Sequence, residues 1–225
     1  MIFLNQALAV LYKDLLSEWR TKERLSPMAF FVLLVLLVFN FSFELGGAAI
    51  HQIGPGVLWS SFVFASLLGL HRTFAEEYES GCIDGLLAAP GERSGLYLGK
   101  MLGNLVFLLV VELLSLPFFA LFFNLAPGLF LAPLLLVFAL GAASLAGVGT
   151  LFAALSCNMR LRELLLPLLL LPMVLPALIA CIEATRLVLQ QRAFLTLVPY
   201  LQILVVYTIV FVTLSLILFE YVLEE

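Results

Sequence analysis

Few residues of this chain have the types and spacing that catalysis or metal binding requires. The two histidines, His51 and His71, stand apart, and the three cysteines, Cys82, Cys157 and Cys181, are widely separated. This spacing indicates neither a zinc site nor a disulfide framework. The sequence also lacks the His-Glu-x-x-His and Gly-x-Ser-x-Gly motifs of metalloproteases and serine hydrolases. We therefore expect no catalytic residue and no metal site, and we interpret both histidines as solvated side chains.

The segment closest to a nucleotide-binding motif is Gly95-Leu-Tyr-Leu-Gly99-Lys100-Met101. It has three residues between its glycines instead of four, and it lacks the Ser or Thr that would bind magnesium. We therefore expect that this chain does not hydrolyse ATP. Small residues one helical turn apart favour close helix packing instead. They form two strips, Gly95, Gly99 and Gly103 in one and Ala139, Ala143 and Gly147 in the other.

Two features interrupt otherwise apolar stretches. Glu112 is the only acid well inside one, about 25 Å along a helix from Ser94. An intramembrane carboxylate is a functional candidate, and it could be protonated, paired to a neighbouring subunit or facing an aqueous cavity; a structural pairing is the leading interpretation. Pro167, Pro172 and Pro176 interrupt the hydrogen-bond ladder of a later stretch. We expect a static bend there, with a hinge at the last two prolines as the alternative.

The composition places these residues in a lipid bilayer. Of the 225 residues 64% are hydrophobic and only 12% are charged, which is more apolar surface than a soluble domain can bury. We predict one all-α, polytopic membrane domain with six transmembrane helices, because each of six stretches approaches the ~20 residues needed to span the hydrocarbon. These predicted spans are 25–43, 56–73, 95–123, 129–156, 164–182 and 197–219. The net charge of −4 and the dispersed cations argue against a nucleic-acid partner.

Residues 1–24 differ from the predicted spans. Apolar side chains from Phe3 to Trp19 recur at three- and four-residue spacing, and the charged residues fall largely on the other side. This pattern predicts an interfacial amphipathic helix with Tyr12 and Trp19 near the lipid headgroups. An ordinary helix facing the protein core is the alternative. A cleavable signal peptide is not expected, because charges interrupt the segment and no cleavage site follows.

The distribution of cations predicts the orientation. If the N-terminus is cytoplasmic, all of the eleven Lys and Arg residues except Arg186 and Arg192 fall in inside segments. Cytoplasmic loops carry the excess of cations in membrane proteins. We therefore expect both termini in the cytoplasm.

Residues 72–94 form the longest polar interruption, with the sequence RTFAEEYESGCIDGLLAAPGERS. Its acids cannot remain in hydrocarbon, and its apolar residues fall on one side of a helix that Pro90-Gly91 would end. A short cytoplasmic amphipathic helix that docks another protein and a solvated loop are both compatible with this pattern.

Three stretches resemble the heme exporter B family, CcmB: GPGVLW at 54–59, SLLGLHRTFAEEYESGCIDGLLAAP at 66–90 and LPMVLP at 171–176. The most specific part is a cytoplasmic motif that reads approximately Phe-x-x-Asp-x-x-Asp-Gly-Ser-Leu-Glu-x-Leu in the family. Residues that match it directly are Phe74, Gly81 and Leu86. Conservative replacements are Glu77, Ile83 and Asp84. Two residues depart from it, Ser80 in place of an acid and Cys82 in place of a serine.

The resemblance implies a permease subunit of an ABC-type complex for cytochrome c maturation in a bacterial cytoplasmic (inner) membrane. Residues 74–90 would be a coupling helix that docks on the ATPase through Phe74, Glu76, Glu77, Gly81, Ile83, Asp84 and Leu86. The expected partners are an ATPase (CcmA-like), a second copy of the chain, a heme-handling membrane subunit (CcmC-like), a small single-span subunit (CcmD-like) and a heme chaperone (CcmE-like). Heme and ATP-Mg would be handled by these partners.

Other classes of function remain as alternatives to this interpretation. An ion-coupled secondary transporter normally has several buried ionisable sites, whereas Glu112 is nearly alone. Another ABC-2 type exporter subunit would share the same span pattern, and an intramembrane enzyme would need motifs that the chain lacks. The cargo is also open between heme itself and ATP-driven release of a heme-loaded chaperone, and we favour release.

Overall fold

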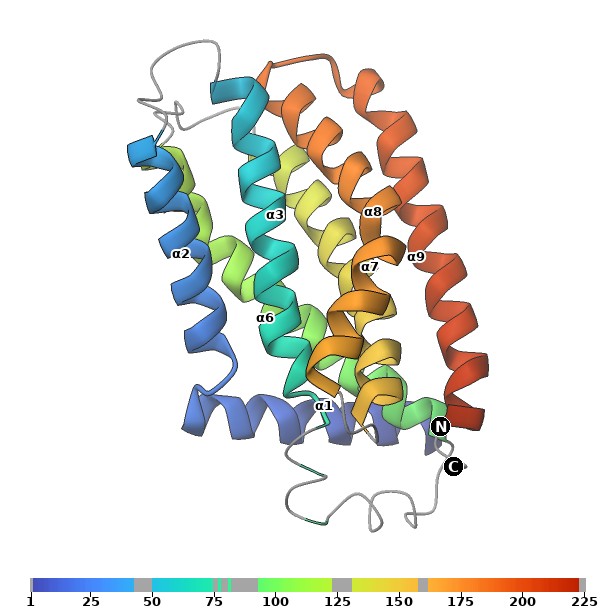
Figure 1. The fold of residues 1–225 in the computed structure, drawn as a ribbon. Coiled ribbons are helices and arrows are strands. Elements are labelled where there is room, and N and C mark those ends of the chain that lie inside the picture. Colours follow the sequence, from blue (N-terminus) through green and yellow to red (C-terminus); the bar gives the residue numbers. More distant parts are fainter. Residues whose placement is uncertain are drawn as a thin grey trace.

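The fold is known from a computed structural model that describes residues 2–42, 50–74, 77, 81, 93–122, 131–157 and 162–222. All regular structure in these ranges is helical (Figure 1). The helices are α1 (Ile2–Thr21), α2 (Leu25–Ser42), α3 (Ile50–His71), α6 (Arg93–Phe122), α7 (Leu131–Cys157), α8 (Arg162–Leu189) and α9 (Phe194–Val222). Six of them, α2 to α9, are long and apolar enough to cross a membrane. The predicted all-α membrane class is therefore confirmed.

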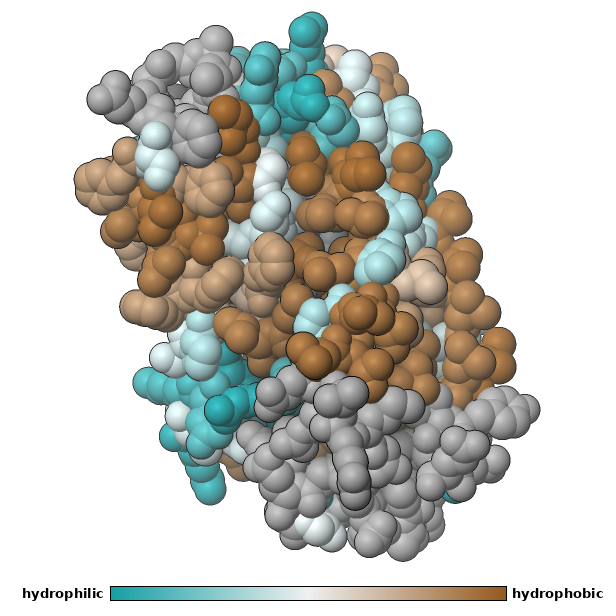
Figure 2. Space-filling model, viewed as in Figure 1, coloured by the Kyte–Doolittle hydropathy of each residue, from teal (hydrophilic) through white to brown (hydrophobic). Residues whose placement is uncertain are grey.

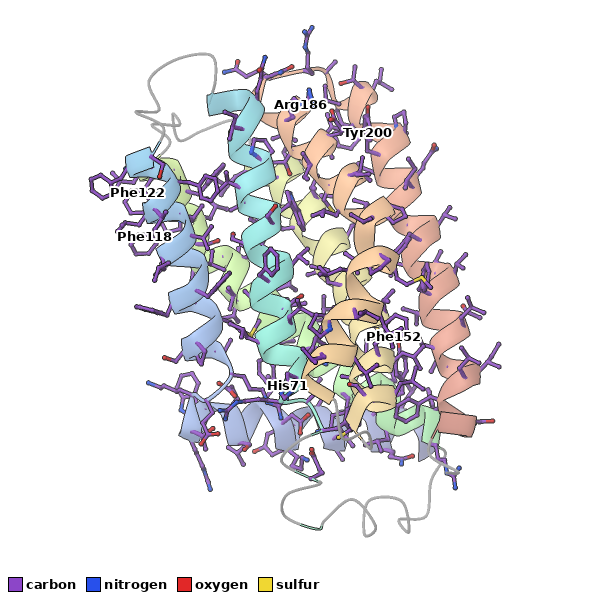
Figure 3. The ribbon with its side chains drawn as sticks, in the orientation of Figure 1. His71, Phe118, Phe122, Phe152, Arg186 and Tyr200 are labelled. Atoms are coloured by element: carbon purple, nitrogen blue, oxygen red, sulfur yellow. The ribbon has the colours of Figure 1, made fainter. Side chains whose placement is uncertain are left out.

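The six long helices run side by side, and α1 lies across one end of the bundle, roughly perpendicular to them (Figure 1). His71 lies at this α1 end, whereas Arg186 lies at the opposite end (Figure 3). A hydrophobic band occupies the middle of the visible face, with hydrophilic residues above it and at its lower left (Figure 2). The molecule thus has the apolar belt and polar ends of a membrane-spanning bundle.

The corner between α1 and α2 is fixed by a carboxylate. Glu18 accepts hydrogen bonds from the backbone N–H groups of Arg24 at 3.0 Å and Leu25 at 2.8 Å. These are unpaired donors at the start of α2, so Glu18 caps that helix from the preceding one. Lys22 between them adopts a left-handed φ of 55°, which turns the chain from α1 into the first span.

Three helices are several residues longer than the predicted apolar stretches. Helix α9 runs from Phe194 to Val222 instead of 197–219. Helix α8 continues beyond residue 182 to Leu189, because Glu183 pairs with Arg186 one turn later and Ala184 and Val188 are buried. Gln191 then ends it with a left-handed φ of 56°. Helix α3 begins at Ile50 instead of 56 and includes Pro55 near its start, where a missing N–H removes only one ladder bond.

The core of the bundle surrounds α7, which packs against α6, α8 and α9. Trp59 and Phe62 of α3 meet Phe138 of α7 in mutual edge-to-face contacts with centroids 5.5 to 5.8 Å apart. The Trp59 indole N–H donates to the Thr185 hydroxyl of α8 at 2.8 Å. Gly141 leaves the space that the Trp59 ring occupies. Dense aromatic packing and one satisfied buried donor therefore hold α3, α7 and α8 together.

Candidate functional site: a charged junction at the α1 end

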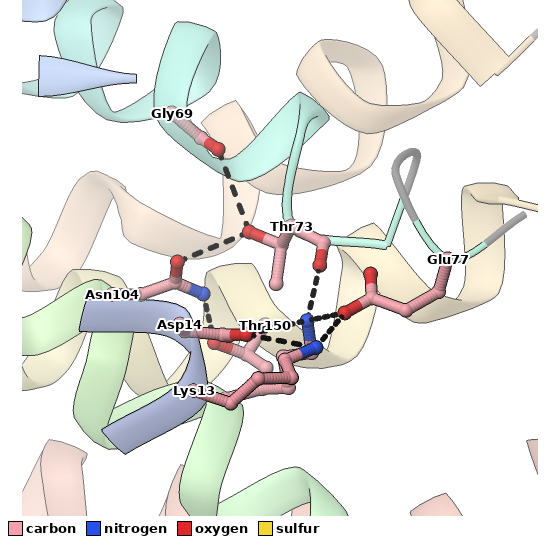
Figure 4. A network of polar contacts seen from close by, with 8 residues as sticks. Lys13, Asp14, Gly69, Thr73, Glu77, Asn104 and Thr150 are labelled. Carbon is pink, nitrogen blue, oxygen red and sulfur yellow. Dashed lines mark hydrogen bonds and ion pairs between the residues drawn. The ribbon is translucent and has the colours of Figure 1, made fainter. Parts of the chain in front are cut away.

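A lysine near the start of α6 is completely buried. The side chain of Lys100 has 0% exposure, and its ammonium lies 2.5 Å from a carboxylate oxygen of Glu77 and 3.1 Å from one of Asp14 (Figure 4). It also donates a hydrogen bond to the backbone carbonyl of Thr73 at 2.8 Å. Its partners come from α1 and from the chain that follows α3. A buried cation is tolerated only with such partners, so Lys100 ties three elements together.

A second lysine balances the charges. The ammonium of Lys13 lies 2.5 Å from the same Glu77 oxygen and 3.1 Å from Asp14, and its side chain is half exposed. Lys13, Asp14, Glu77 and Lys100, which we call the junction cluster, thus contain two cations and two anions. Near the surface this pairing satisfies charges that would otherwise be costly to bury.

The charges of the junction cluster shift one another's pKa values. Burial alone would raise the pKa of Glu77, but Lys100 and Lys13 outweigh it and hold that pKa below its usual value. Burial would lower the pKa of Lys13, but the hydrogen bond to Glu77 and the nearby Asp14 raise it instead. Both groups therefore remain charged over the physiological range.

Hydrogen bonds extend the junction to α7. The Thr73 hydroxyl donates to the Asn104 side-chain oxygen at 3.0 Å, and the Asn104 amide donates to the Thr150 hydroxyl at 2.9 Å. Thr150 in turn donates to the carbonyl of Ala146 at 2.7 Å. The residues after α3 are thereby linked through α6 to α7 (Figure 4).

Phe74, the first residue of the predicted docking motif, packs into the bundle. Its side chain is buried. The centroid of its ring lies 5.4 Å from the Lys100 ammonium and 6.2 Å from the centroid of the Phe219 ring of α9. Phe219 also contacts Tyr97 at 5.4 Å, and the Tyr97 hydroxyl donates to the carbonyl of Gly147 at 2.8 Å. This aromatic contact anchors the start of the motif to α6, α7 and α9.

The structure therefore separates the predicted docking residues. Phe74 and Glu77, which the sequence assigned to the ATPase surface, point into their own chain because Lys100 attracts both. Gly81 is exposed and has a left-handed φ of 65°, a conformation that favours glycine. The remaining members of the predicted set, Glu76, Ile83, Asp84 and Leu86, lie outside the described residues, as does most of the predicted helix 74–90.

The glycine strip of α6 receives α1. A Cβ on Gly99 would stand 2.7 Å from both the Ala7 carbonyl and the Val10 Cβ, and one on Gly95 would stand 2.8 Å from Gln6. Gly103 is less crowded, with its nearest neighbour 3.8 Å away. The strip thus lets α1 approach the start of α6 closely, which brings Asp14 to Lys100.

The second predicted strip is only partly packed within this chain. A Cβ on Gly147 would stand 3.0 Å from Val212 of α9. Ala143 is half-buried, and Ala139 is exposed. Among the described residues, the Gly147 end therefore serves a contact between α7 and α9.

Glu112 is fully buried, and neither carboxylate oxygen has a hydrogen-bond partner among the described residues. Its own backbone carbonyl accepts from Ser115. The structural pairing predicted for it is not found in the described part of the chain. Nor can a neighbouring subunit reach it in this arrangement, because the side chain has no exposed surface.

The other sequence candidates show no sign of chemistry. His71 is half-buried, and its Nε2 is buried without a hydrogen-bond partner among the described residues, so it is less solvated than expected. The side chain of His51 lies outside the described residues. Helix α8 continues through Pro167, Pro172 and Pro176. No metal-binding group of His, Cys, Asp and Glu occurs within the described ranges.

The sequence interpretation missed Lys100 and Asp14 as site residues. In the sequence, Lys100 stands in the false phosphate loop and among the inside cations, and Asp14 is one of the charged residues on the polar side of residues 1–24. One signal was available: a lysine inside an apolar span requires an acidic partner. The identity of that partner was not, because Asp14 is 86 residues away in the chain.

Known proteins give an independent comparison. The family model described as CcmB protein matches residues 5–222. Heme exporter protein B of Paracoccus denitrificans is 33% identical over 178 residues, covering 79% of this chain and 81% of that protein. The protein of the same name from Rhodobacter capsulatus is 35% identical over 160 residues, covering 71% and 72%. That from Pseudomonas aeruginosa is 31% identical over 160 residues, covering 71% of each chain.

Proposed function

This chain belongs to the CcmB family, and from that membership we propose that it is the membrane permease subunit of an ABC-type heme export complex for cytochrome c maturation. Relatives named heme exporter protein B align with this chain over most of their length. It is a multi-pass membrane protein with six spans and is not itself an enzyme. ATP hydrolysis belongs to a separate CcmA-like chain, and heme and ATP-Mg are handled by partner subunits.

The observation that carries this proposal is the anchoring of the residues after α3. Glu77 is bound by cations from α1 and α6, and Phe74 is packed against Phe219 of α9. A force applied to the segment that follows would therefore act on these three helices together. This arrangement suits a subunit that receives motion from a motor protein on its surface.

The junction cluster also divides the motif into two parts. Phe74 and Glu77 form its root, which is held inside this chain. The remaining part, which we call the tip, contains the acids Glu76 and Asp84 and the apolar Ile83 and Leu86. In our proposal the tip contacts the ATPase. An acidic and apolar surface would fit a cleft lined with basic or amide groups.

We place the α1 end in the cytoplasm. The cations of α1, together with Arg72 after α3 and Arg93 at the start of α6, lie at this end. Arg186, near the end of α8, lies at the opposite end (Figure 3), and Arg192 follows α8 directly. This is the asymmetry of the positive-inside rule. Both termini would then be cytoplasmic, in a bacterial inner membrane.

Helix α1 would lie in the cytoplasmic lipid interface. One of its faces packs on α6 through Ala7 and Val10, and the polar Lys13 and Arg20 fall on a second face. The third face is apolar and strongly exposed, and it consists of Leu4, Leu8, Tyr12, Leu16 and Trp19. Lipid suits this face, because exposed aromatic residues are enriched where headgroups meet hydrocarbon.

The complex would further contain a second copy of this chain, CcmC-like and CcmD-like membrane subunits, and a CcmE-like heme chaperone. The described residues include no metal-ligating cluster. The one described histidine side chain, His71, lies at the α1 end of the bundle and not along a path across it (Figure 3). We therefore favour ATP-driven release of the heme-loaded chaperone over passage of heme through this chain.

Variants of the root and of the tip of the motif test this proposal in a host that depends on the complex. Glu76→Lys combined with Asp84→Lys should abolish co-purification of the ATPase. Lys100→Met should retain the ATPase but strongly reduce heme-stained cytochrome c. Arg72→Gln is the matched control, because Arg72 forms an exposed pair with Glu23 beside the junction.

Two results would contradict the proposal. Unchanged ATPase capture by the double variant would remove the docking role of the tip, and normal cytochrome c in Lys100→Met would remove the transmitting role of the root. If cytochrome c matures normally without this chain, an ion-coupled transporter or another ABC-2 exporter subunit becomes the better assignment.

A further inference from the structure

Glu112 is the most completely buried acid in the described residues. It belongs to the inward stripe of α6 that also contains Asn104, Leu108, Ser115 and Phe119, all buried. The side chain has no exposed surface, and both oxygens lack a hydrogen-bond partner among the described residues. An ionised carboxylate cannot be held this way, since it would be neither solvated nor paired.

No charged group of the helices that pack on α6 forms a hydrogen bond with Glu112 in the described residues. Helix α2 and helix α7 contain no Asp, Glu, Lys, Arg or His, and the histidines of α3 stand at its two ends. Helix α9 carries only Glu220, near its end. The charges of α1 meet α6 near Lys100, twelve residues or about 18 Å along the helix from Glu112. The Arg24 guanidinium lies over the Phe107 ring of α6, 5.8 Å from its centroid and five residues before Glu112. The Cys181 thiol of α8 is a titratable neighbour of Glu112, and a thiol supplies no positive charge. The nearest compensation for a negative charge is therefore a proton on the carboxyl itself.

A packed, unpartnered carboxyl has no structural benefit, since a leucine would fill the same space without the cost of a buried polar group. Its presence is explained if a second conformation of the subunit exposes this face of α6 to water. Pro117 lies five residues further along α6 and removes a ladder bond there, so this part of the helix is suited to bending.

We propose that Glu112 is a proton-binding site of the transport cycle: it holds a proton while α6 is packed and releases it when the inward face of α6 opens. On opening, the carboxyl O–H bond breaks, the proton passes to water and a hydrated carboxylate remains. On closing, the carboxylate takes a proton from water before it is buried. The packed state therefore binds one proton more than the open state for each copy of the chain.

The sign of the pH dependence follows from this difference in bound protons. A state that binds the extra proton is favoured at low pH and loses ground as pH rises. Once the carboxyl of the open state is ionised, the ratio of packed to open complex should fall tenfold for each pH unit. Without the carboxyl the ratio should not change with pH through this site.

The first arm of the test is infrared spectroscopy of the purified chain in lipid at pH 7, without an ATPase. The spectrum should contain a protonated-carboxyl C=O band that disappears in Glu112→Gln. The band should persist in the matched control Glu183→Gln, because Glu183 is paired with Arg186 and partly exposed. Absence of the band from the wild-type chain would overturn the proposal.

The second arm uses the assembled complex and a pH-indicator dye, and it rests on the proposed function. A non-hydrolysable ATP analogue should release about one proton per copy of this chain in the wild type and none in Glu112→Gln. No release from the wild type, or equal release from both proteins, would overturn the proposal. If Glu112→Gln fails to fold, Glu112→Met serves the same comparison.

The two arms keep this proposal separate from the assignment of the complex. A chain that captures no ATPase contradicts the proposed function and leaves the infrared result standing. A complex that captures the ATPase but shows no protonated Glu112 contradicts only the proton site.

Discussion

Replacing Lys100 by methionine should destabilise the protein far more than its distance from the membrane core suggests. The side chain is completely buried, and its ammonium is within 3.1 Å of both Asp14 and Glu77. Methionine fills similar space but leaves two buried carboxylates with only the half-exposed Lys13 as a partner. Breaking a buried ion pair by removing one member costs about 3–5 kcal/mol.

For a chain of this size, that loss should lower the Tm of the protein in mild detergent by roughly 6–20 °C. The control is Arg72→Gln, which removes an exposed ion pair whose two atoms, on Arg72 and Glu23, lie 2.6 Å apart. This change should lower the free energy of unfolding by at most about 1 kcal/mol. Adding Glu77→Gln to Lys100→Met should restore part of the lost Tm, because it leaves a balanced Lys13–Asp14 pair.

The assay is thermal unfolding of the purified chain, followed by circular dichroism and by the loss of monodisperse protein. A Tm for Lys100→Met within the range of Arg72→Gln would refute the reasoning, because it would mean that the two carboxylates are not buried against this lysine. A Tm for the double variant below that of Lys100→Met would refute the charge-balance explanation.

Three further predictions concern other contacts. Gly99→Ala should lower the free energy of unfolding by about 1–3 kcal/mol, because the added methyl group pushes α1 away from α6. Gly103→Ala should be neutral or slightly stabilising, because no neighbour lies closer than 3.8 Å. Equal changes in Tm for the two variants would contradict this packing. Because the pKa of Glu77 is lowered from its ordinary 4.5, its stabilisation should be full above that pH and fade as pH falls through the lowered value, and Glu77→Gln should flatten that limb of the Tm–pH curve. Thr185→Val should cost about 1–3 kcal/mol by leaving the Trp59 indole N–H unpaired, while Trp59→Phe should remove that sensitivity to position 185.

The sequence was sufficient for the membrane class and for most of the spans. Runs such as residues 25–42 are apolar on all sides, and such a helix has few stable environments other than lipid. The end of α8 was placed too early, because Glu183 and Arg186 are polar individually but neutralise each other one turn apart. Local composition shows such charges, and it does not show that they pair within one helix.

The junction cluster could not be predicted from sequence in the same way. Its contacts join residues 86 and 23 positions apart in the chain, and no local pattern encodes such pairing. The family motif did locate Phe74 and Glu77, but a motif does not specify whether a side chain points toward a partner or into its own chain. The glycine strip correctly indicated that a helix packs closely on α6. The structure was needed to identify that helix as α1.

The central claim, that the segment after α3 is a cytoplasmic handle for an ATPase, can be tested by labelling Cys82, which lies outside the described residues. Cys157 and Cys181 would first be replaced by serine. A membrane-impermeant maleimide should label Cys82 in inside-out vesicles only, and bound ATPase should protect it. Labelling of Cys82 in right-side-out vesicles would contradict the account, since no cytoplasmic ATPase could then reach this segment.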